Sequence, residues 1–327
     1  MTTALLCLAE LEVTYRMRRR APVRAVVGVS LGVGEARTMA LIGESGSGKS
    51  SIARAICGLA PVSGGAVLMG GRDLAREADR PRAAGESGIQ IVFQDPVGSL
   101  DPRWPVWRSV AEPRLARFRE TAEERRRVAL RLLDRVGLGE VAAGRRPHHL
   151  SGGQRQRATI ARALAAEPRL VILDEAVSAL DVSVRNEVLV LLDELKRERG
   201  LTYLFISHDM GAVAQMASDV AVLYLSRLVE VGEAGAVIHN PVHPYTRALI
   251  AAVPSIHAAH PKEARAAGEI DDPANPPPGC RFHRRCAYAV ARCREDEPAG
   301  REYAGRTVAC HRAEDVDRLA RDGAATT

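Results

Sequence analysis

The sequence predicts an α/β fold built on a mainly parallel sheet. Two apolar runs, Leu170–Leu173 and Leu201–Ile206, have the length of buried strands, and the amphipathic stretch Ser183–Arg199 between them has helical spacing. Earlier in the chain, Leu11–Tyr15 and Arg37–Gly43 also have the character of strands. Strands that alternate with helices at this spacing are typical of α/β proteins, in which the strands lie mainly parallel.

The other segments divide the chain into parts. A helix is expected from Lys49 to about Leu59, and residues 101–166 have a mostly helical pattern. From Pro254 to Gly279 the composition shifts to proline, alanine and charge, as in a linker or an extended arm. The predicted parts are a main domain of residues 1–253, which contains a helical subdomain at about 100–166, and an extension of residues 254–327.

The composition limits the class of protein. The 46 basic and 40 acidic side chains of the 327 residues give a net charge of +6, and only three of the basic residues are lysines. Such an excess of arginine is typical of a GC-rich genome, although a mild positive charge also suits nucleic acid or an anionic membrane surface. No stretch approaches the ~18 apolar residues of a membrane span, and the N-terminus lacks the basic region of a secretory signal. A soluble intracellular chain is expected.

Residues 43–50 read GESGSGKS, which fits the phosphate-binding pattern GxxxxGK[ST] between a strand and a helix. The glycines let backbone N–H groups converge on phosphate oxygens, and the following helix adds its positive end. Lys49 is expected at the β- and γ-phosphates and the Ser50 hydroxyl at Mg²⁺. The alternative is a loop that only turns the chain. The predicted ATP-binding residues of this segment are Gly43, Glu44, Ser45, Gly46, Ser47, Gly48, Lys49, Ser50 and Ser51.

Two carboxylates close the apolar strand that begins at Leu170. Asp174 is expected to hold Mg²⁺ there, and Glu175 is expected to polarise the water that attacks the γ-phosphorus. An Asp-Glu pair at a strand end is often a solvated turn, but the phosphate loop favours the catalytic interpretation.

A second glycine-containing segment, Leu150–Arg157, precedes the acidic strand and reads LSGGQRQR. Ser151 and two glycines at the start of a helix offer another anion-binding N-terminus. One molecule rarely needs two such cradles for one phosphate, which indicates two chains that share a nucleotide. The segment resembles the signature of ATP-binding-cassette (ABC) ATPases.

Other motifs of that family follow. Gln94 comes after a strand, a Ser178–Asp181 turn follows the acidic pair, and His208 follows the last core strand. The resemblance covers about residues 8–250. It implies the P-loop NTPase fold of an ABC nucleotide-binding domain, with a RecA-like core, a β-rich N-terminal subdomain and a helical subdomain. A cysteine-containing C-terminal extension follows here.

The resemblance also implies roles for single residues. ATP would bind between the phosphate loop of one cassette and the LSGGQ segment of another, in a head-to-tail dimer. Gln94 would sense Mg²⁺ and the attacking water while touching the membrane partner, and His208 would contact the γ-phosphate. Tyr15 is expected to stack on adenine, the alternative being an ordinary half-buried strand aromatic. The residues expected to bind the ATP of the facing subunit are Ser151, Gly152, Gly153, Gln154 and Asp181.

Four segments narrow the resemblance to the oligopeptide/dipeptide importer ATPases. Such importers pair two different cassettes, and this chain is similar to the second of the pair. The resemblance implies a subunit that powers the import of peptides or related solutes and lies peripherally at the cytoplasmic face of the cell membrane. The implied partners are a second ATPase subunit in a heterodimer, two transmembrane permease subunits and an extracytoplasmic solute-binding protein. The segments are Ile91–Pro96, Ser99–Arg103, His239–Leu249 and Asn275–Cys286.

Four of the six cysteines lie in the extension, spaced C-x5-C-x6-C-x16-C. Because disulfides are disfavoured in the cytosol, clustered thiols suggest a metal. Four thiolates are the ligand number of a [4Fe–4S] cluster, which the resemblance also supports. Zn²⁺, with His283 or His311 as a ligand, and free thiols are the alternatives. The cysteines concerned are Cys280, Cys286, Cys293 and Cys310, whereas Cys7 and Cys57 are interpreted as small core hydrophobes.

Two other functions compete with transport. A soluble ABC ATPase acting on ribosomes or DNA would carry two fused cassettes or a long coiled-coil insertion, and neither is visible. A nucleic-acid-binding protein would use basic clusters such as Arg18–Arg20 and Arg125–Arg127, but no nucleic-acid-binding signature accompanies them. No nucleic-acid partner is therefore expected. The isolated histidines, interpreted as structural or surface residues, are His148, His149, His239 and His243.

Overall fold

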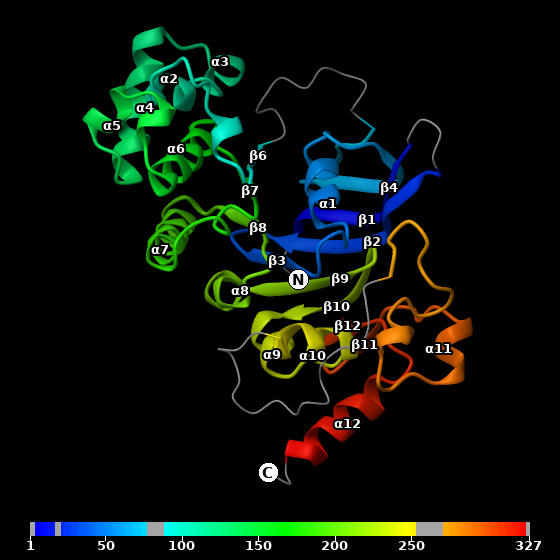
Figure 1. Ribbon diagram of the computed structural model, residues 1–327. Helices are drawn as coiled ribbons and strands as arrows, with labels where there is room; N and C mark the ends of the chain where they lie inside the picture. Colours follow the sequence, from blue (N-terminus) through cyan, green and yellow to red (C-terminus); the bar gives the residue numbers. More distant parts are fainter. Residues whose placement is uncertain (1–3, 17–20, 77–87, 253–270, 325–327) are drawn as a thin grey trace.

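The computed structural model of the chain describes residues 4–16, 21–76, 88–252 and 271–324. Their strands form two sheets, of which the smaller is antiparallel (Figure 1). Its order is β2–β1–β4–β5, so the first strand of the chain, β1, lies between β2 and β4. The strands are β1 (Ala4–Tyr15), β2 (Val23–Gly34), β4 (Val62–Met69) and β5 (Arg72–Asp73).

The larger sheet confirms the predicted α/β class. Its order is β11–β12–β10–β9–β3–β8–β7–β6, and the five strands from β9 to β6 pair in parallel. Each predicted strand overlaps a strand of one of the two sheets, whereas the sequence did not indicate β2, β4, β5 or β9 to β12. The strands of the larger sheet are β3 (Thr38–Ile42), β6 (Ile89–Val92), β7 (Leu170–Asp174), β8 (Thr202–Ile206), β9 (Asp219–Tyr224), β10 (Arg227–Glu233), β11 (Arg301–Tyr303) and β12 (Arg306–Val308).

The central strands separate two hydrophobic cores. Successive side chains of a strand point to opposite faces, so Tyr203 and Phe205 of β8 enter one core while Leu204 and Ile206 enter the other. The first core packs against helices, and the second lies between the two sheets. Cys57 packs against the second core, in agreement with its interpretation as a small hydrophobe.

Five helices form a separate group beside the end of the larger sheet that carries β6 (Figure 1). They confirm the predicted helical pattern of residues 101–166. The longest two begin with capping boxes, at Thr121 for α4 and at Ser151 for α6. In each box the hydroxyl accepts from the backbone N–H three residues on, and the side chain of that residue accepts from the backbone N–H of the capping residue. The helices are α2 (Val106–Ala111), α3 (Arg114–Arg117), α4 (Ala122–Arg135), α5 (Glu140–Gly144) and α6 (Gly152–Ala165).

The remaining helices lie beside the sheets or in the extension. None of those in the described ranges is both long and apolar enough to cross a membrane. They are α1 (Lys49–Ile56), α7 (Val182–Arg199), α8 (Met210–Met216), α9 (Ala234–His239), α10 (Pro244–Ala251), α11 (Ala291–Glu295) and α12 (Ala313–Ala324), with short 3₁₀ turns η1 (Val97–Ser99), η2 (Pro147–His149) and η4 (His283–Arg285).

The extension joins the edge of the larger sheet, where β12 pairs with β10 (Figure 1). A fully buried carboxylate, Glu230 of β10, lies 3.2 Å from Nη1 of Arg306 in β12. The same guanidinium donates to the carbonyl oxygens of Ala236 and Asn240, both at 2.8 Å. Most of the predicted linker, residues 253–270, lies outside the described residues.

Candidate nucleotide-binding site

The candidate site residues follow the carboxyl ends of four parallel strands. In the register of the sheet, Val92 of β6 lies opposite Leu173 of β7, and Asp174 lies opposite Ile206 of β8. Ligands of parallel α/β sheets bind outside this edge. The residues that leave it are the Gly43 loop after β3, Gln94 after β6, Asp174 and Glu175 at β7, and His208 after β8.

The phosphate loop passes close to its neighbours. A Cβ atom at Gly43, where φ is +148°, would lie 2.2 Å from the carbonyl oxygen of Leu223. At Gly48, where φ is +109°, a Cβ atom would lie 2.3 Å from that of Ala25. Only glycine avoids both the contact and the strained backbone, so the pattern inferred from the sequence has a steric reason.

The side chain of Lys49 is folded back over this loop. Its residue is 6% exposed, and Nζ donates to the carbonyl oxygens of Gly43 and Glu44, both at 2.8 Å, and to Ser47 Oγ at 3.2 Å. Burial lowers the pKa of Lys49, while the nearby carboxylates, Glu175 foremost, act to raise it. The loop therefore surrounds the terminal nitrogen of Lys49 with three oxygen atoms.

Ser50 and Asp174 meet as the sequence predicts for a magnesium site. The hydroxyl of Ser50, at the start of α1, donates to Asp174 Oδ1 at 3.1 Å. Burial raises the pKa of Asp174, and the Ser50 hydrogen bond opposes that change. Hydroxyl and carboxylate oxygens are ligands that Mg²⁺ prefers, so this pair fits the ion.

Glu175 and His208 lie side by side next to that pair. His208 Nδ1 is 3.6 Å from Glu175 Oε1. The backbone of Glu175 is left-handed, with φ of +51°, and its N–H donates to Ile206 O at 3.0 Å. A non-glycine residue in this region stores strain that the surrounding structure must hold, which is common at active sites.

Tyr15 contacts Ser51, which the sequence predicts as an ATP-binding residue without a specific role. Its hydroxyl, at the end of β1, donates to Ser51 Oγ at 3.3 Å, and its half-buried ring packs against the core between the sheets. The aromatic is thus placed beside α1 and the loop. The sequence could not indicate this pair, because 36 residues separate its members.

Of the residues expected to face a second subunit, Ser151, Gly152 and Asp181 are exposed, and Gly153 and Gln154 are half-buried. Ser151 Oγ accepts from the N–H of Gln154 at 3.2 Å, and Gln154 Oε1 accepts from the N–H of Ser151 at 3.0 Å. Gly153 packs tightly, because a Cβ atom there would lie 2.5 Å from Val184 Cγ1. Asp181 is exposed at the start of α7, and its side chain makes no capping bond. No hydrogen bond among the described residues joins these residues to the phosphate loop.

Sequence reasoning missed the partners of Glu44 in the loop. Its carboxylate pairs with Arg285 of the extension through two contacts of 2.9 Å, and its N–H donates to the Tyr245 hydroxyl at 2.8 Å. Tyr245 is buried against Tyr224, with ring centroids 4.5 Å apart. No sequence motif indicates such contacts.

The four extension cysteines, Cys280, Cys286, Cys293 and Cys310, line one small pocket. The N–H of Cys280 donates to Cys293 O at 2.8 Å. Burial, followed by weaker effects of the neighbouring thiols, raises the pKa of Cys280 to about 12 and that of Cys286 to about 11. Within the described ranges, no group of three or more His, Cys, Asp or Glu has the arrangement of a metal site. The structure gathers the thiols without showing a metal centre.

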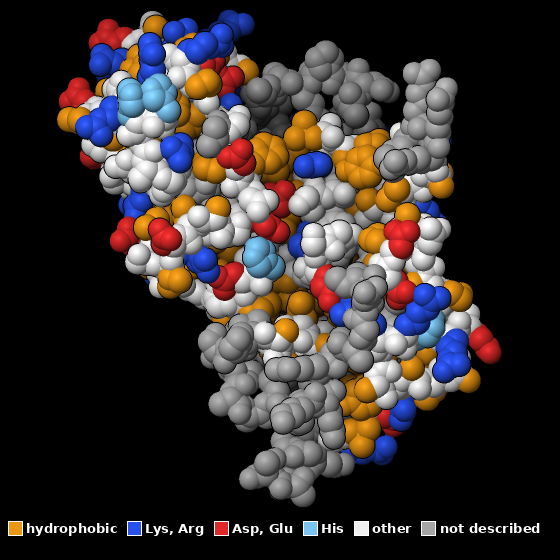
Figure 2. Space-filling view, in the orientation of Figure 1, with side chains coloured by type: hydrophobic (Ala, Val, Ile, Leu, Met, Phe, Trp, Pro, Cys, Tyr) orange, Lys and Arg blue, Asp and Glu red, His pale blue; other side chains and the backbone are white. Residues whose placement is uncertain are grey.

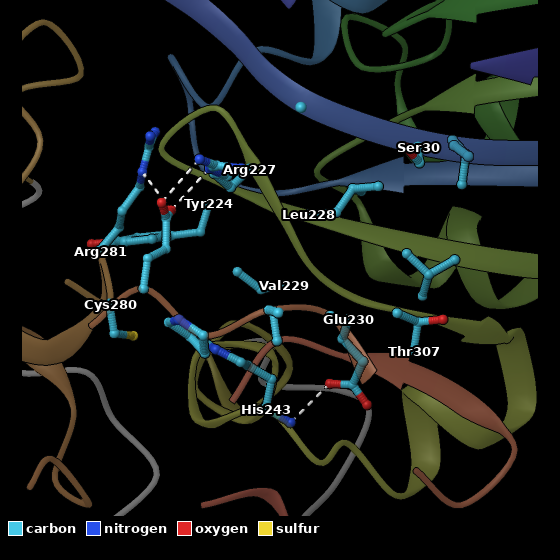
Figure 3. A pocket seen from close by; sticks show the side chains of 18 of the residues that line it. Ser30, Tyr224, Arg227, Leu228, Val229, Glu230, His243, Cys280, Arg281 and Thr307 are labelled. Carbon is cyan, nitrogen blue, oxygen red and sulfur yellow. Dashed lines mark hydrogen bonds and ion pairs between the residues drawn. The ribbon is translucent and has the colours of Figure 1, made fainter. Parts of the chain in front are cut away.

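The interpretation of His243 as a structural residue agrees with its position. It is 1% exposed, and its Nδ1 accepts from the N–H of Tyr245 at 3.1 Å, which caps α10. It also lines a larger cavity between β2, β10 and the extension, together with Tyr224 and Cys280 (Figure 3). The cavity separates parts of the extension from the cassette.

Comparison with known proteins places the chain in a family. The family described as "ABC transporter" matches residues 26–178, and the one described as "Oligopeptide/dipeptide transporter, C-terminal region" matches residues 229–293. The chain is 43% identical over 289 residues to the dipeptide transport ATP-binding protein DppF of Escherichia coli, covering 88% of this chain and 86% of that protein. It is 43% identical to the oligopeptide transport ATP-binding protein AppF of Bacillus subtilis, covering 90% and 91% respectively.

Solved structures of ATP-binding cassettes have a fold similar to that of this chain. The dimeric ATP-binding cassette MJ0796, bound to ADP and Pi, superimposes with a TM-score of 0.62 and 28% identity over 70% of this chain and 98% of that one. The cassette cbiO1 of Clostridium perfringens gives a TM-score of 0.62 at 27% identity, over 72% and 91% respectively. The chain belongs to the ATP-binding proteins of ABC transporters, in the group that carries the oligopeptide/dipeptide transporter C-terminal region.

Proposed function

We propose that the chain is the ATP-hydrolysing subunit of an ABC importer for peptides or related small solutes. One observation carries the enzymatic part: Lys49, the Ser50–Asp174 pair and the Glu175–His208 pair converge at one edge of the parallel sheet. The names of the relatives and the extension that they share support the transported class.

The chemistry is derived from these side chains. The Nζ of Lys49 leaves its carbonyl partners to bind the β- and γ-phosphates of ATP, and Tyr15 stacks on the adenine. Ser50, Asp174 and Gln94 would hold Mg²⁺, which would neutralise charge on the phosphates. Glu175 accepts a proton from the attacking water, and His208, 3.6 Å away, contacts the γ-phosphate and fixes the carboxylate.

The second phosphate cradle serves a facing subunit. Ser151, Gly152, Gly153, Gln154 and Asp181 are exposed or half-buried at helix starts, where N–H groups and the helix dipole attract anions. We infer a heterodimer with a second ATPase subunit, two permease subunits that Gln94 touches, and an extracytoplasmic solute-binding protein. The chain would lie at the cytoplasmic face of the membrane.

The four extension cysteines support the assignment of a metal cofactor. Four thiols around one pocket match the ligand number of a [4Fe–4S] cluster, with Zn²⁺ as the alternative. We also propose the division into an ATPase domain, residues 1–253 with the helical subdomain at about 100–166, and an extension, residues 254–327.

A nucleic-acid function has less support. On the face shown in Figure 2, basic and acidic side chains are interspersed over the helices α2 to α6. The basic cluster Arg125–Arg127 lies in α4 among these helices, while Arg18–Arg20 lies outside the described residues. Nucleic-acid-binding surfaces concentrate one sign of charge.

The Glu175→Gln variant tests the enzymatic part. Because the amide cannot accept the proton of water, ATP turnover should fall by about 10²- to 10⁴-fold, while binding of ATP persists. Turnover is measured as phosphate release with Mg²⁺ and with EDTA, and the exposed Glu123→Gln in α4 serves as the matched control. Wild-type turnover in Glu175→Gln would remove Glu175 from the mechanism.

A further inference from the structure

An ion pair between Arg285 and Glu44 joins the C-terminal extension to the phosphate loop. We propose that Arg285 is a positioning residue of the ATP site: through Glu44 it holds the phosphate loop in the shape that binds ATP, so that the extension sets the affinity of the cassette for nucleotide. The proposal rests on ATP binding by this loop.

The contact between Arg285 and Glu44 is bidentate. Nη1 and Nη2 of Arg285 each lie 2.9 Å from a different carboxylate oxygen of Glu44. The arginine side chain is 8% exposed and the glutamate side chain 22% exposed. A paired, largely buried fork of this kind fixes direction as well as distance, so the side chain of Glu44 has one position relative to the extension.

A second contact fixes the backbone of the same residue. The N–H of Glu44 donates to the hydroxyl of Tyr245, which is 1% exposed. The ring of Tyr245 packs against Tyr224 and Phe282, with centroids 4.5 Å and 5.5 Å away. Arg285 also donates to the Tyr224 hydroxyl at 3.3 Å. One packed cluster therefore holds both the backbone and the side chain of Glu44.

Glu44 lies next to the groups that bind phosphate. Its carbonyl oxygen accepts from Lys49 Nζ, and its carbonyl also accepts from the N–H of Ser47 at 3.2 Å. A displaced Glu44 would therefore move the ammonium group and the backbone that are to receive the phosphates. A loss of pre-organisation of this kind lowers affinity without removing a ligand contact.

The extension has other ion pairs with the main domain besides that of Arg285. Glu297 pairs with Arg227 of β10 at 2.9 Å, again through both oxygens, and Arg306 pairs with Glu230. Figure 3 shows the side chains of Arg227 and Arg281 converging on one carboxylate, and both pair with Glu297. The extension is thus held on β10 by pairs that do not touch the phosphate loop, which leaves the Arg285 pair available for the ATP site.

The cysteine segment is part of the same unit. Arg285 is the last residue of η4, and Cys286 follows it directly. Phe282 lies between Cys280 and Cys286 in the sequence. A Cβ atom at Gly46 of the loop would lie 3.7 Å from Pro273 Cγ, so the extension covers the loop at a further point. A shift of the Cys280–Cys286 segment is therefore transmitted to Glu44.

The test compares nucleotide affinity in the full chain. Arg285→Met should weaken binding of mant-ATP by about 5-fold or more, with a smaller loss in Arg285→Lys, which keeps the charge but not the fork. In a Glu44→Gln background, Arg285→Met should add less than about twofold. The matched control Arg227→Met, which breaks the other bidentate attachment, should bind mant-ATP as wild type does. Melting temperature is measured for every variant.

The outcomes separate the possible roles. Wild-type affinity in Arg285→Met, or an equal loss in Arg227→Met, overturns the positioning role, and so does full additivity with Glu44→Gln. If Arg285→Met does not fold, the comparison of Arg285→Lys with Glu44→Gln and their double variant decides the question. A wild-type chain that fails to bind mant-ATP would instead contradict the proposed function.

Discussion

Single side chains carry the chemistry of the nucleotide site. Lys49 is buried near carboxylates, Ser50 already donates to Asp174, and Glu175 has a left-handed backbone next to His208. Each of these side chains is held by a hydrogen bond, by burial or by a neighbouring charge. Pre-organised groups of this kind lose little free energy on reordering when substrate arrives.

The four extension cysteines lead to a prediction about the metal content of the chain. Anaerobically purified chain should contain iron and acid-labile sulfide in about equal amounts, near four of each per chain. Cys293→Ser, which removes the most buried of the four thiols, should lose both, whereas Cys57→Ser should keep them. Zinc in place of iron would support the alternative ion, and a chain without either metal would leave free thiols.

Elements position these residues from distant parts of the chain. The four strand ends meet because β6, β7, β8 and β3 are neighbours in parallel register, although they lie far apart in sequence. At the other edge of the sheet, β12 adds the extension to β10. The buried Glu230–Arg306 pair lies at that junction, and Glu230 also accepts from the backbone N–H groups of Val242 and His243.

We expect Arg306→Met to lower the free energy of unfolding by about 3–5 kcal/mol, because it leaves the buried carboxylate of Glu230 without its charged partner. Urea unfolding measures the change. Arg301→Met on the neighbouring strand β11 is the control: its pair with Glu314 is exposed, so stability should stay close to that of wild type. Equal stability of the two variants would contradict a structural role for the buried pair.

At the scale of the whole molecule, the proposed ATP site takes residues from two subunits. The phosphate loop and the Ser151 segment belong to different parts of one chain, and each lies at the start of a helix. Two cassettes that face each other would bring the two parts together, and the dimeric cassette of similar fold supports this arrangement.

The Ser151→Asp variant tests whether the Ser151 segment belongs to an ATP site shared by two cassettes. Aspartate keeps a side-chain cap on α6 but faces the γ-phosphate with a like charge, so turnover of the assembled transporter should fall by about tenfold or more. The isolated chain should bind mant-ATP as wild type does, because its own loop is intact. Thr121→Asp, at the similar capping box of α4, is the control. Unchanged turnover in Ser151→Asp would exclude the segment from the shared site.

The sequence by itself determined the phosphate loop, the acidic strand end and the capped start of α6. Each of these features is made by consecutive residues, whose spacing and backbone conformation suffice to specify it. The tertiary structure decided what the loop touches. Arg285 and Tyr245 reach Glu44 from 241 and 201 residues away, and the same holds for Glu230 and Arg306. Such pairs follow from how strands and the extension pack, and no local pattern records packing between distant segments.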